Sequence, residues 1–402
     1  MSRFLAPAVC LLCVGTAVAE DWPQFRGPRY DNISREAGWN AKSLAPEPSI
    51  AWKRDVGIGY AGPAVVGDAV YVMGHADGQE HVRRLDAKTG EVVWTHSYPG
   101  ALVDNLNAGG PGATPTVAGD VVYTNGREGQ LYCLKTSDGS VVWNVKLPEA
   151  YSLKVPAWGF TSSPLLIDGM VVVDAGRLVA LDAKTGKEVW KSDAQYKPGY
   201  GTPTPFEFQG QTYLAHLNND GVTVASLADG KEAAFFQIDA QFDTASTSPA
   251  VRGDKLWISV GYADGACVLL KFDGSSLAEL YRNKDLRNHF SNSLLIGDHV
   301  YGIDGQTNNS RTCQLVCMEF ETGEVAWKQR GGGFGSLVAA DGKLIYLNDK
   351  GLAAVIPVSP KKFAVTSKGQ VLDGQCWTAP VLAGGRLYCR NSEGTLVAVT
   401  MQ

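Results

Sequence analysis

Two long polar segments hold the side chains that are best suited to chemistry. The first, residues 103–112, contains Asp104, Asn105 and Asn107. Carboxylate and amide oxygens are ligands that Ca²⁺ prefers, but this segment lacks the spaced D-x-D-x-D-G pattern of a calcium loop. Asparagine is also a common turn residue. We therefore predict no metal site and keep Asn105 and Asn107 as candidate ligand-binding residues.

The second polar segment, residues 282–293, contains Arg287, His289 and Asn292. An arginine can clamp a carboxylate, and a histidine can act as an acid or a base near neutral pH. Polar loops on a rigid scaffold are common binding sites. A solvated loop rich in turn-forming residues explains the same composition, so both interpretations stay open.

Aromatic residues recur shortly before apolar runs along the chain. They are Tyr60, Phe160, Tyr200, Phe290, Phe334 and Trp377, with Trp158 close to one of them. Small or polar residues follow at Gly62, Thr114, Ser163, Thr204, Ser248, Asn292, Ser336 and Ala379. If the runs are strands that converge on one axis, these residues form a funnel with a polar floor and an aromatic collar, the usual form of a ligand pocket. Crowding at the axis explains the same residue types without a ligand.

The candidate ligand-binding residues therefore come from the collar, the small positions and the two polar segments. They are Tyr60, Asn105, Asn107, Thr114, Trp158, Phe160, Tyr200, Thr204, Arg287, His289, Asn292 and Trp377. No G-x-S-x-G, P-loop or H-E-x-x-H motif accompanies them in the sequence. We name no catalytic residue and no metal ligand.

The elements that must position these residues repeat along the chain. Short β-rich runs that follow a Gly/Asp turn recur eight times, at intervals of about 41 to 52 residues. This period predicts an all-β fold, an eight-bladed β-propeller with four-stranded antiparallel blades over residues 49–402. The last repeat stops before its outer strand, and residues 49–55 read as that strand. We expect this N-terminal strand to close the last blade, which leaves no unpaired edge.

A tryptophan ends the same motif in several repeats, as in LDAKTGEVVW at residues 85–94 and LDAKTGKEVW at residues 181–190. These tryptophans are Trp52, Trp94, Trp143, Trp190 and Trp327. A large flat side chain at one blade position can wedge between neighbouring blades and bury roughly 150–250 Å² each time. We predict a structural docking role for them, which the fourth, fifth and seventh blades have lost.

The repeat resembles that of the pyrroloquinoline-quinone-like (PQQ-like) propeller superfamily, whose motif is A/L-x-D-x-x-T-G-x-x-x-W. The stretch DWPQFRGP at residues 21–28 is similar to the start of exported bacterial members. The resemblance implies PQQ with Ca²⁺ as the candidate cofactor, since the superfamily includes quinoprotein dehydrogenases. It equally implies a non-catalytic scaffold such as BamB. The chain lacks the adjacent cysteine pair of the large quinoprotein alcohol dehydrogenases and the C-x-x-C-H motif of haem-bearing members.

The first 19 residues are typical of an export signal, with Arg3 before an apolar run and Ala17-Val18-Ala19 as the cleavage site. We expect a soluble, exported protein of the periplasm or cell envelope that is not a lipoprotein. Loss of Arg3 and of no acid changes the net charge from −5 to −6, which disfavours binding to nucleic acid. Six cysteines remain, and both disulfides and buried thiols are open to them.

The sequence leaves three functions to weigh. The first is a non-catalytic, monomeric scaffold that binds an envelope protein or a small ligand. The second is a PQQ-dependent oxidoreductase that uses the funnel, and the third is a carbohydrate-binding or carbohydrate-active propeller. We expect residues 20–48 to form an N-terminal extension outside the propeller, with Trp22, Phe25 and Arg26 pinning it across the rim of the blades.

Overall fold

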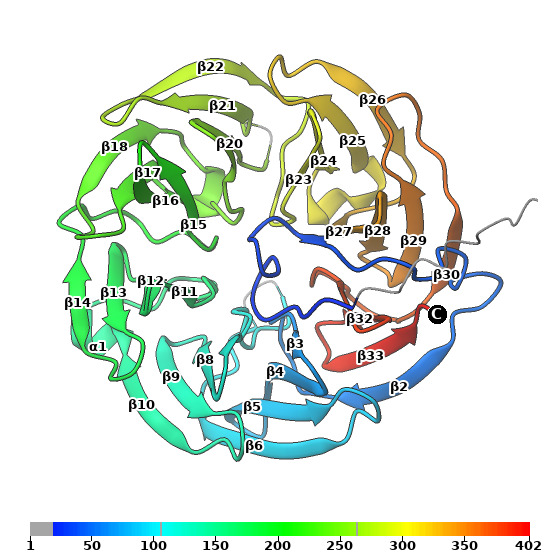
Figure 1. Ribbon diagram of the computed structural model, residues 1–402, viewed down its shortest axis with the longest axis horizontal. Coiled ribbons are helices and arrows are strands. Elements are labelled where there is room, and N and C mark those ends of the chain that lie inside the picture. The colour runs from blue at the N-terminus through cyan, green and yellow to red at the C-terminus, as the bar shows by residue number, and fades with distance from the viewer. Residues whose placement is uncertain (1–18, 105–106, 263) are drawn as a thin grey trace, which may run out of the picture.

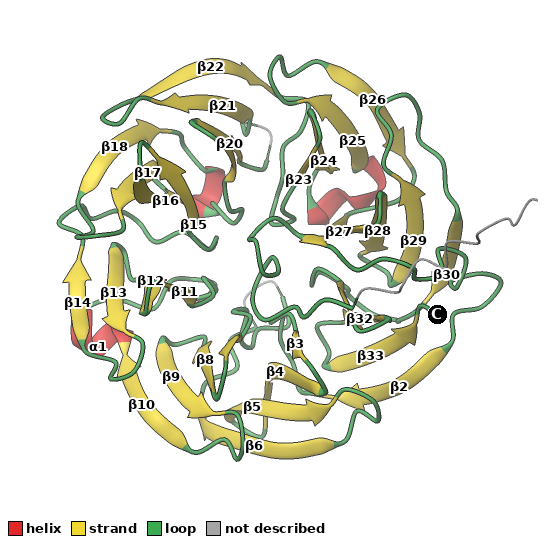
Figure 2. Cartoon of the chain, viewed as in Figure 1, coloured by secondary structure: helices red, strands yellow, loops and turns green. Residues whose placement is uncertain are grey.

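Eight antiparallel sheets form a closed ring around a central axis (Figure 1). The computed structural model describes residues 19–104, 107–262 and 264–402. Nearly all regular structure is strand, as Figure 2 shows. The predicted all-β, eight-bladed propeller with four strands in each blade is therefore confirmed. The proposed export signal lies almost wholly outside the described residues.

Each blade runs outward from the axis, with its first strand innermost. The first four blades are β3 (Ala64–Val66), β4 (Ala69–Ala76), β5 (Gln79–Asp86) and β6 (Val92–Pro99); β7 (Thr116–Ala118), β8 (Val121–Asn125), β9 (Gln130–Lys135) and β10 (Val141–Lys146); β11 (Leu165–Ile167), β12 (Met170–Asp174), β13 (Leu178–Asp182) and β14 (Glu188–Lys191); and β15 (Thr204–Phe208), β16 (Gln211–Leu217), β17 (Gly221–Ser226) and β18 (Glu232–Gln237).

The remaining blades follow the same pattern. They are β19 (Ala250–Arg252), β20 (Lys255–Ser259), β21 (Cys267–Phe272) and β22 (Leu277–Asn283); β23 (Leu294–Ile296), β24 (His299–Asp304), β25 (Gln314–Glu319) and β26 (Val325–Arg330); β27 (Gly335–Ala340), β28 (Lys343–Asn348), β29 (Leu352–Pro357) and β30 (Ser367–Gln370); and β31 (Val381–Ala383), β32 (Arg386–Arg390), β33 (Thr395–Thr400) and β2 (Ile50–Asp55). A short strand, β1 (Ile33–Ser34), adds to the seventh blade.

Helical segments are few and short. They are α1 (Leu147–Tyr151) and the 3-10 segments η1 (Gln241–Asp243) and η2 (Thr307–Thr312). Among the described residues, no helix is long and apolar enough to cross a membrane. The six described cysteines, Cys133, Cys267, Cys313, Cys317, Cys376 and Cys389, are all buried free thiols. Of the two alternatives for the cysteines, the structure therefore has buried thiols.

Turn chemistry and burial explain why these sequences form blades. Between β11 and β12, Asp168 and Gly169 have φ angles of 48° and 74°, the left-handed pair that a tight two-residue hairpin requires. Middle strands such as β12 are apolar almost throughout, because neighbouring blades cover both of their faces. Outer strands such as β6 bury alternate positions instead, which is the pattern of a sheet with one solvated face.

The N-terminal strand closes the ring as predicted. β2 pairs antiparallel with β33, and Trp52 lies opposite Ala398. The buried Arg390 of β32 strengthens this junction, because its Nη1 donates to the carbonyls of Ala61 and Met73 at 2.6 and 2.7 Å. The Arg390 side chain and the backbone pairing of β2 with β33 therefore both join the first blade to the last blade.

The five tryptophans at the repeat position all make the same contact with the following blade. Each indole Nε1 donates to a backbone carbonyl there at 2.8 or 2.9 Å, in the pairs Trp52–Ala87, Trp94–Thr136, Trp143–Ala183, Trp190–Leu227 and Trp327–Ser359. The rings of Trp52, Trp94, Trp143 and Trp190 also lie against a turn glycine. A Cβ at Gly90 would stand 2.6 Å from Cδ2 of Trp52, so only glycine fits there.

The fifth blade keeps this contact with a different residue. Tyr281 occupies the tryptophan position, and its hydroxyl donates to the carbonyl of Phe320 at 3.1 Å. Its ring lies against Gly323, as the indoles lie against their glycines. The expectation that this blade has lost the contact is thus corrected, because a tyrosine supplies both the flat ring and the donor.

The N-terminal extension crosses the central channel (Figure 1). Trp22 forms an antiparallel bridge with Val65 of β3, with N···O distances of 2.7 and 2.8 Å. The carbonyl of Pro23 accepts from the N–H of Val117 in β7 at 2.8 Å. Further along, β1 pairs parallel with the innermost strand of the seventh blade, β27. The extension thus bonds to the innermost strands of the first, second and seventh blades.

This path corrects the expectation that Trp22, Phe25 and Arg26 lie across the blade rim. Trp22 and Arg26 are buried at the axis. The guanidinium of Arg26 reaches the innermost strand of the fourth blade, where Nη1 donates to Oγ1 of Thr204 at 3.0 Å. Backbone pairing with exposed strand groups at the axis, together with burial of apolar surface, favours the central path.

Candidate functional site

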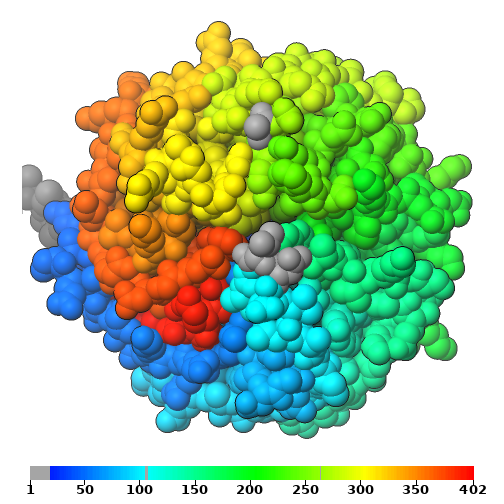
Figure 3. Space-filling view, turned by 180° about the vertical axis from the view of Figure 1, so that it is seen from behind, coloured from blue at the N-terminus to red at the C-terminus, as the bar shows by residue number. Residues whose placement is uncertain are grey.

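A cavity of about 650 Å³ lies on the axis of the ring. Its walls come from the segments that lead into the innermost strands, and its floor includes four residues of the extension, Trp22, Phe25, Arg26 and Asn32. Figure 3 shows the face opposite the extension, where all blades converge on the centre. Because the extension crosses the channel at one end, the cavity is a funnel that opens at the other.

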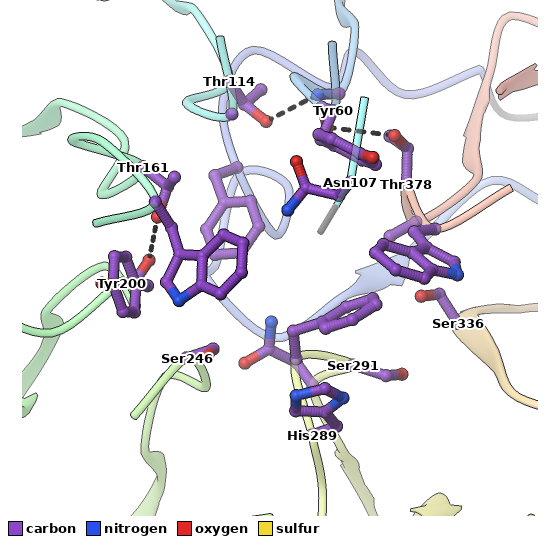
Figure 4. A pocket seen from close by; sticks show the side chains of 18 of the residues that line it. Tyr60, Asn107, Thr114, Thr161, Tyr200, Ser246, His289, Ser291, Ser336 and Thr378 are labelled. Carbon is purple, nitrogen blue, oxygen red and sulfur yellow. Dashed lines mark hydrogen bonds between the residues drawn. The ribbon is translucent and has the colours of Figure 1, made fainter. Parts of the chain in front are cut away.

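Hydrogen bonds between neighbouring blades build the wall of the funnel. From the first blade to the fifth, a backbone N–H donates to a small side chain of the next blade at 2.7–3.2 Å, in the pairs Gly62–Thr114, Thr114–Ser163, Ser163–Thr202, Thr202–Ser248 and Ser248–Asn292. Figure 4 shows the first of these bonds. The small polar residues noted in the sequence therefore satisfy backbone donors where eight strands crowd together.

One half of the funnel mouth carries a continuous row of rings, which we call the aromatic arc. It consists of Tyr60, Trp377, Phe290, His289 and Tyr262, with successive ring centroids 5.7, 5.0, 5.0 and 4.7 Å apart. Tyr60 and Trp377 are stacked with an interplanar angle of 25°. Tyr60 and His289 both lie at the edge of the cavity in Figure 4. Such a row offers flat apolar surface to a ligand.

Hydrogen bonds hold the first ring of the arc in place. The hydroxyl of Tyr60 donates to Oε1 of Gln375 at 2.8 Å and accepts from the N–H of Ala108 at 3.0 Å. Oγ1 of Thr378 donates to the carbonyl of Tyr60 at 3.0 Å. Ala108 and the lead-in to the eighth blade are therefore hydrogen-bonded to the same residue, Tyr60.

The structure brings eight of the twelve predicted ligand-binding residues together in the funnel lining. They are Tyr60, Asn107, Thr114, Trp158, Tyr200, His289, Asn292 and Trp377. They come from the first, second, third, fourth, sixth and eighth blades and their connections, which the repeat had placed around one axis. Asn105 lies outside the described residues.

Three predicted residues lie elsewhere. Phe160 is buried in the core beneath the rim, against Gly129. Thr204 is the first residue of β15, where its hydroxyl donates to the carbonyl of Pro249 at 2.8 Å; Thr202 takes the small position that we had assigned to it. Arg287 forms an ion pair with Asp304 of β24, with Nε and Oδ1 3.0 Å apart.

Sequence reasoning missed two arginines that line the funnel. Arg26 belongs to the extension, and Arg127 lies in the turn between β8 and β9. Neither stands next to an aromatic collar residue in the sequence, and the extension carries no repeat that would place it. The phrase DWPQFRGP itself was the only available signal, because it combines large apolar residues with an arginine in a segment free of strand periodicity.

Burial controls the titratable groups at the site. It lowers the pKa of His289 to about 4, so the imidazole is neutral at pH 7. It also raises the pKa of Tyr200 to about 12 and lowers that of Arg26 to about 10. Arg26 therefore keeps its positive charge at neutral pH, while His289 and Tyr200 are uncharged. The arrangement holds neutral hydrogen-bonding groups and fixed positive charge.

The lining does not suit a calcium-dependent cofactor. Ca²⁺ takes six to eight oxygen ligands and normally includes carboxylates among them. Among the described lining residues there is no Asp or Glu. Nor does the described part of the chain contain a group of three His, Cys, Asp or Glu residues that could hold a metal ion. The residues present do not fit Ca²⁺ bound together with PQQ.

The fold and the site place this protein in the class of closed eight-bladed propellers with an aromatic-walled funnel on the axis. Comparison of the sequence with known families identifies the family of this protein. The family described as outer membrane protein assembly factor BamB matches residues 78–329, more than half of the chain. This chain belongs to that family.

Individual relatives include both assembly factors and dehydrogenases. Outer membrane protein assembly factor BamB of Shewanella oneidensis is 25% identical over 324 residues, which cover 75% of this chain and 66% of that protein. Quinoprotein ethanol dehydrogenase of Pseudomonas putida is 29% identical over 181 residues, or 40% of this chain and 27% of that enzyme. The crystal structure of BamB from Moraxella catarrhalis shares the fold, with a TM-score of 0.61 at 15% identity over 88% of this chain and 98% of that one.

Proposed function

We propose that this protein is a non-catalytic binding scaffold of the bacterial cell envelope, and that its funnel holds the bound ligand or partner segment. The observation that carries the proposal is the closure of the channel by the extension. An open pore through a propeller has no floor, whereas this one ends on Trp22, Phe25 and Arg26 beneath an aromatic wall. A concave site with apolar walls and a few polar groups is suited to binding.

The family supports the scaffold and the location. BamB relatives carry a name that assigns them to outer membrane protein assembly, which is a binding task in the envelope. The residues that line the funnel also support binding over catalysis. His289 is neutral at pH 7 because burial lowers its pKa to about 4, and no carboxylate among the described lining residues stands beside it as an acid–base partner.

A PQQ-dependent oxidoreductase is the second candidate, and one observation favours it. The aromatic arc presents stacked flat rings, as a planar cofactor would need, and quinoprotein relatives match part of the chain. The absence of Asp and Glu from the described lining weighs against it, because the calcium ion that accompanies PQQ would lack carboxylate ligands. A carbohydrate ligand is a third candidate, since sugars also stack on aromatic rings.

A ligand screen by thermal shift tests the proposal. The mature protein would be melted with a library of envelope metabolites and short peptides, and every stabilising compound would be titrated against Trp377→Ala. We expect at least one compound to bind the wild type and to lose about tenfold in affinity in the variant, because a stacking face is removed. Phe235→Ala, on the outer strand β18, is the matched control and should bind normally.

Binding that survives Trp377→Ala, or a library with no stabilising compound, would contradict the funnel as the binding site. Oxidation of a substrate by the purified protein would contradict the non-catalytic part of the proposal.

A further inference from the structure

Positive charge is concentrated in the funnel of an acidic protein. The chain has 41 acidic and 36 basic residues that ionise at pH 7. The described lining nevertheless contains two arginines, Arg26 and Arg127, and no acidic residue. Low-dielectric walls around a charge of one sign focus its field into the cavity. The funnel therefore has an electrostatic preference opposite to that of the molecule as a whole.

Arg26 is buried and only partly satisfied. The residue is 5% exposed, and Nη1 alone has acceptors, Oγ1 of Thr204 at 3.0 Å and the carbonyl of Pro249 at 3.2 Å. Nε is buried and has no hydrogen-bond partner among the described residues. An arginine has five N–H donors in a planar fork, so more than half of them remain for another acceptor.

The backbone of Arg26 is also held in an unfavourable conformation. Its φ is 64°, in the left-handed region that costs a residue with a side chain roughly 1–2 kcal/mol. Asn32, the other polar lining residue of the extension, has φ 59°. Residues held in this region often lie at binding sites, where the surrounding structure imposes the conformation. Two of the three non-glycine residues with positive φ in the extension, Arg26 and Asn32, therefore face the funnel, and the third, Tyr30, does not line it.

Arg390 shows what a structural buried arginine looks like in the same protein. It is fully buried, and both terminal nitrogens have backbone acceptors, in Ala61, Met73 and Gly57, at 2.6–2.8 Å. Its guanidinium joins two blades and does not line the funnel, and its Nε, like that of Arg26, has no partner among the described residues. Arg26 differs because only one terminal nitrogen is bonded and the residue lines the funnel. Joining the extension to the fourth blade does not account for its remaining donors.

Arg127 adds a second positive charge, on which the carboxylates of Glu80 and Glu128 act electrostatically. The residue is 5% exposed, and its Nη2 donates to the carbonyl of Ala157 at 3.0 Å. The nearby carboxylate of Glu80 accepts from the backbone N–H of Arg127 at 3.0 Å and from the hydroxyl of Tyr98 at 2.9 Å. Neither Arg127 nor Arg26 forms an ion pair among the described residues.

From this arrangement we infer that the funnel selects small organic anions, with Arg26 binding the carboxylate or phosphate group and the aromatic arc stacking on the ring that carries it. The inference rests on the proposed function and names the ligand class of the same site. Asp31 acts on Arg26 electrostatically without forming an ion pair with it. A buried guanidinium without an ion-pair partner is costly, and an anionic ligand supplies that partner together with acceptors for the free N–H groups. A neutral ligand of the same shape leaves both needs unmet.

The experiment compares ligands that share a ring and differ in charge. The probes are indole-3-acetate, indoxyl phosphate and indole-3-acetamide, and a sugar set of glucuronate, glucose 6-phosphate and glucose, each titrated by calorimetry at pH 7.5. We expect at least one acid to bind about tenfold more tightly than its neutral partner. The carboxylate and phosphate arms show which anion the site takes.

Variants assign the selectivity to named residues. Arg26→Gln should abolish the preference for the acid, Arg26→Lys should keep part of it, and Arg127→Gln should reduce it several-fold. Arg282→Gln is the matched control, because this arginine pairs with Glu279 on the outer strand β22, away from the funnel. Circular dichroism checks each fold, and if Arg26→Gln does not fold, Arg26→Lys and Arg127→Gln carry the test.

Two outcomes separate the inference from the proposed function. If acid and neutral probes bind equally, or if the arginine variants keep the preference, the anion inference is wrong while the funnel remains a binding site. If no probe of either charge binds the wild type, the anion inference is overturned together with the assignment of the funnel as a small-ligand site.

Discussion

Burial sets the charge state of the single residues in the funnel. His289 packs against the rings of Tyr262, Phe290 and Phe334, and no charged group contributes to its pKa shift. Desolvation alone lowers the pKa to about 4. The sequence pointed to His289 as an acid or base, but its surroundings make it a neutral wall residue. Which neighbours bury a side chain is a long-range property that local sequence does not contain.

The first prediction concerns acid stability. The folded pKa of His289 is about 4 and the unfolded value is 6.5, so the unfolded state binds the proton first as pH falls. Stability from neutral His289 is therefore complete above pH 6.5 and is lost down to about pH 4, by roughly 3 kcal/mol in all. Urea unfolding at pH 7.5 and pH 5 should show a smaller acid-induced loss for His289→Gln than for wild type.

An equal loss in the variant and the wild type would show that His289 titrates normally in the folded protein. For each protein, the free energy of unfolding at pH 5 is compared with the value for the same protein at pH 7.5. A pH-independent effect of the substitution therefore cancels.

At the scale of the element, one contact joins blade to blade around most of the ring. The indole N–H bonds to the next blade and the ring packs on its turn glycine, as Trp143 does with Ala183 and Gly186. The repeat could be recognised in the sequence because five of the eight blades have a tryptophan at the same position, most of them after the same turn. In the fifth blade the sequence put Leu280 and Tyr281 near the tryptophan position, but Tyr281 ends no recognisable motif, and its strand pairing with Leu269 is what identifies it as the substitute.

The second prediction concerns this contact. Trp143→Ala should destabilise the propeller by about 3–5 kcal/mol, because a buried aromatic ring is replaced by a cavity. Trp143→Phe keeps a ring but loses the bond to the carbonyl of Ala183, and should cost less than the alanine variant. The midpoint of urea unfolding measures both. The neighbouring Val142→Thr changes an exposed side chain and should stay within about 0.5 kcal/mol of wild type.

Equal midpoints for Trp143→Ala and Val142→Thr would contradict the role of the ring in joining blades.

At the scale of the whole molecule, the extension closes one end of the central channel and so forms the floor of the funnel. The period of the repeat predicted the eight blades and the closing strand β2, because both depend on local patterns. The path of residues 20–35 was predicted wrongly. That segment bonds to strands whose positions are far away in sequence, such as β7 and β27, so its place depends on the finished ring.

The third prediction is that removal of residues 20–35 opens the channel and lowers the melting temperature. The deletion exposes Val65, which Trp22 covers, and leaves the N–H groups of Val65 and Val117 without their partners. It also removes Arg26 and thus the floor of the funnel. Calorimetric melting would measure the first effect, and titration with the tightest anionic probe would measure the second. Arg35→Ala, an exposed change in the same segment, should do neither.

A truncated protein that melts at the wild-type temperature and binds the probe equally well would contradict the role of the extension as a floor.

The most direct test of the central claim, that this propeller is a binding protein and not a quinoprotein enzyme, is titration of the mature, metal-free protein with PQQ, with and without Ca²⁺. Calorimetry would follow binding, and absorbance would follow quinone reduction when alcohols or sugars are added. The account predicts no dependence of binding on Ca²⁺ and no reduction by substrate, because the described lining has no carboxylate for the metal. Saturable, calcium-dependent binding followed by substrate-driven reduction of the quinone would contradict it.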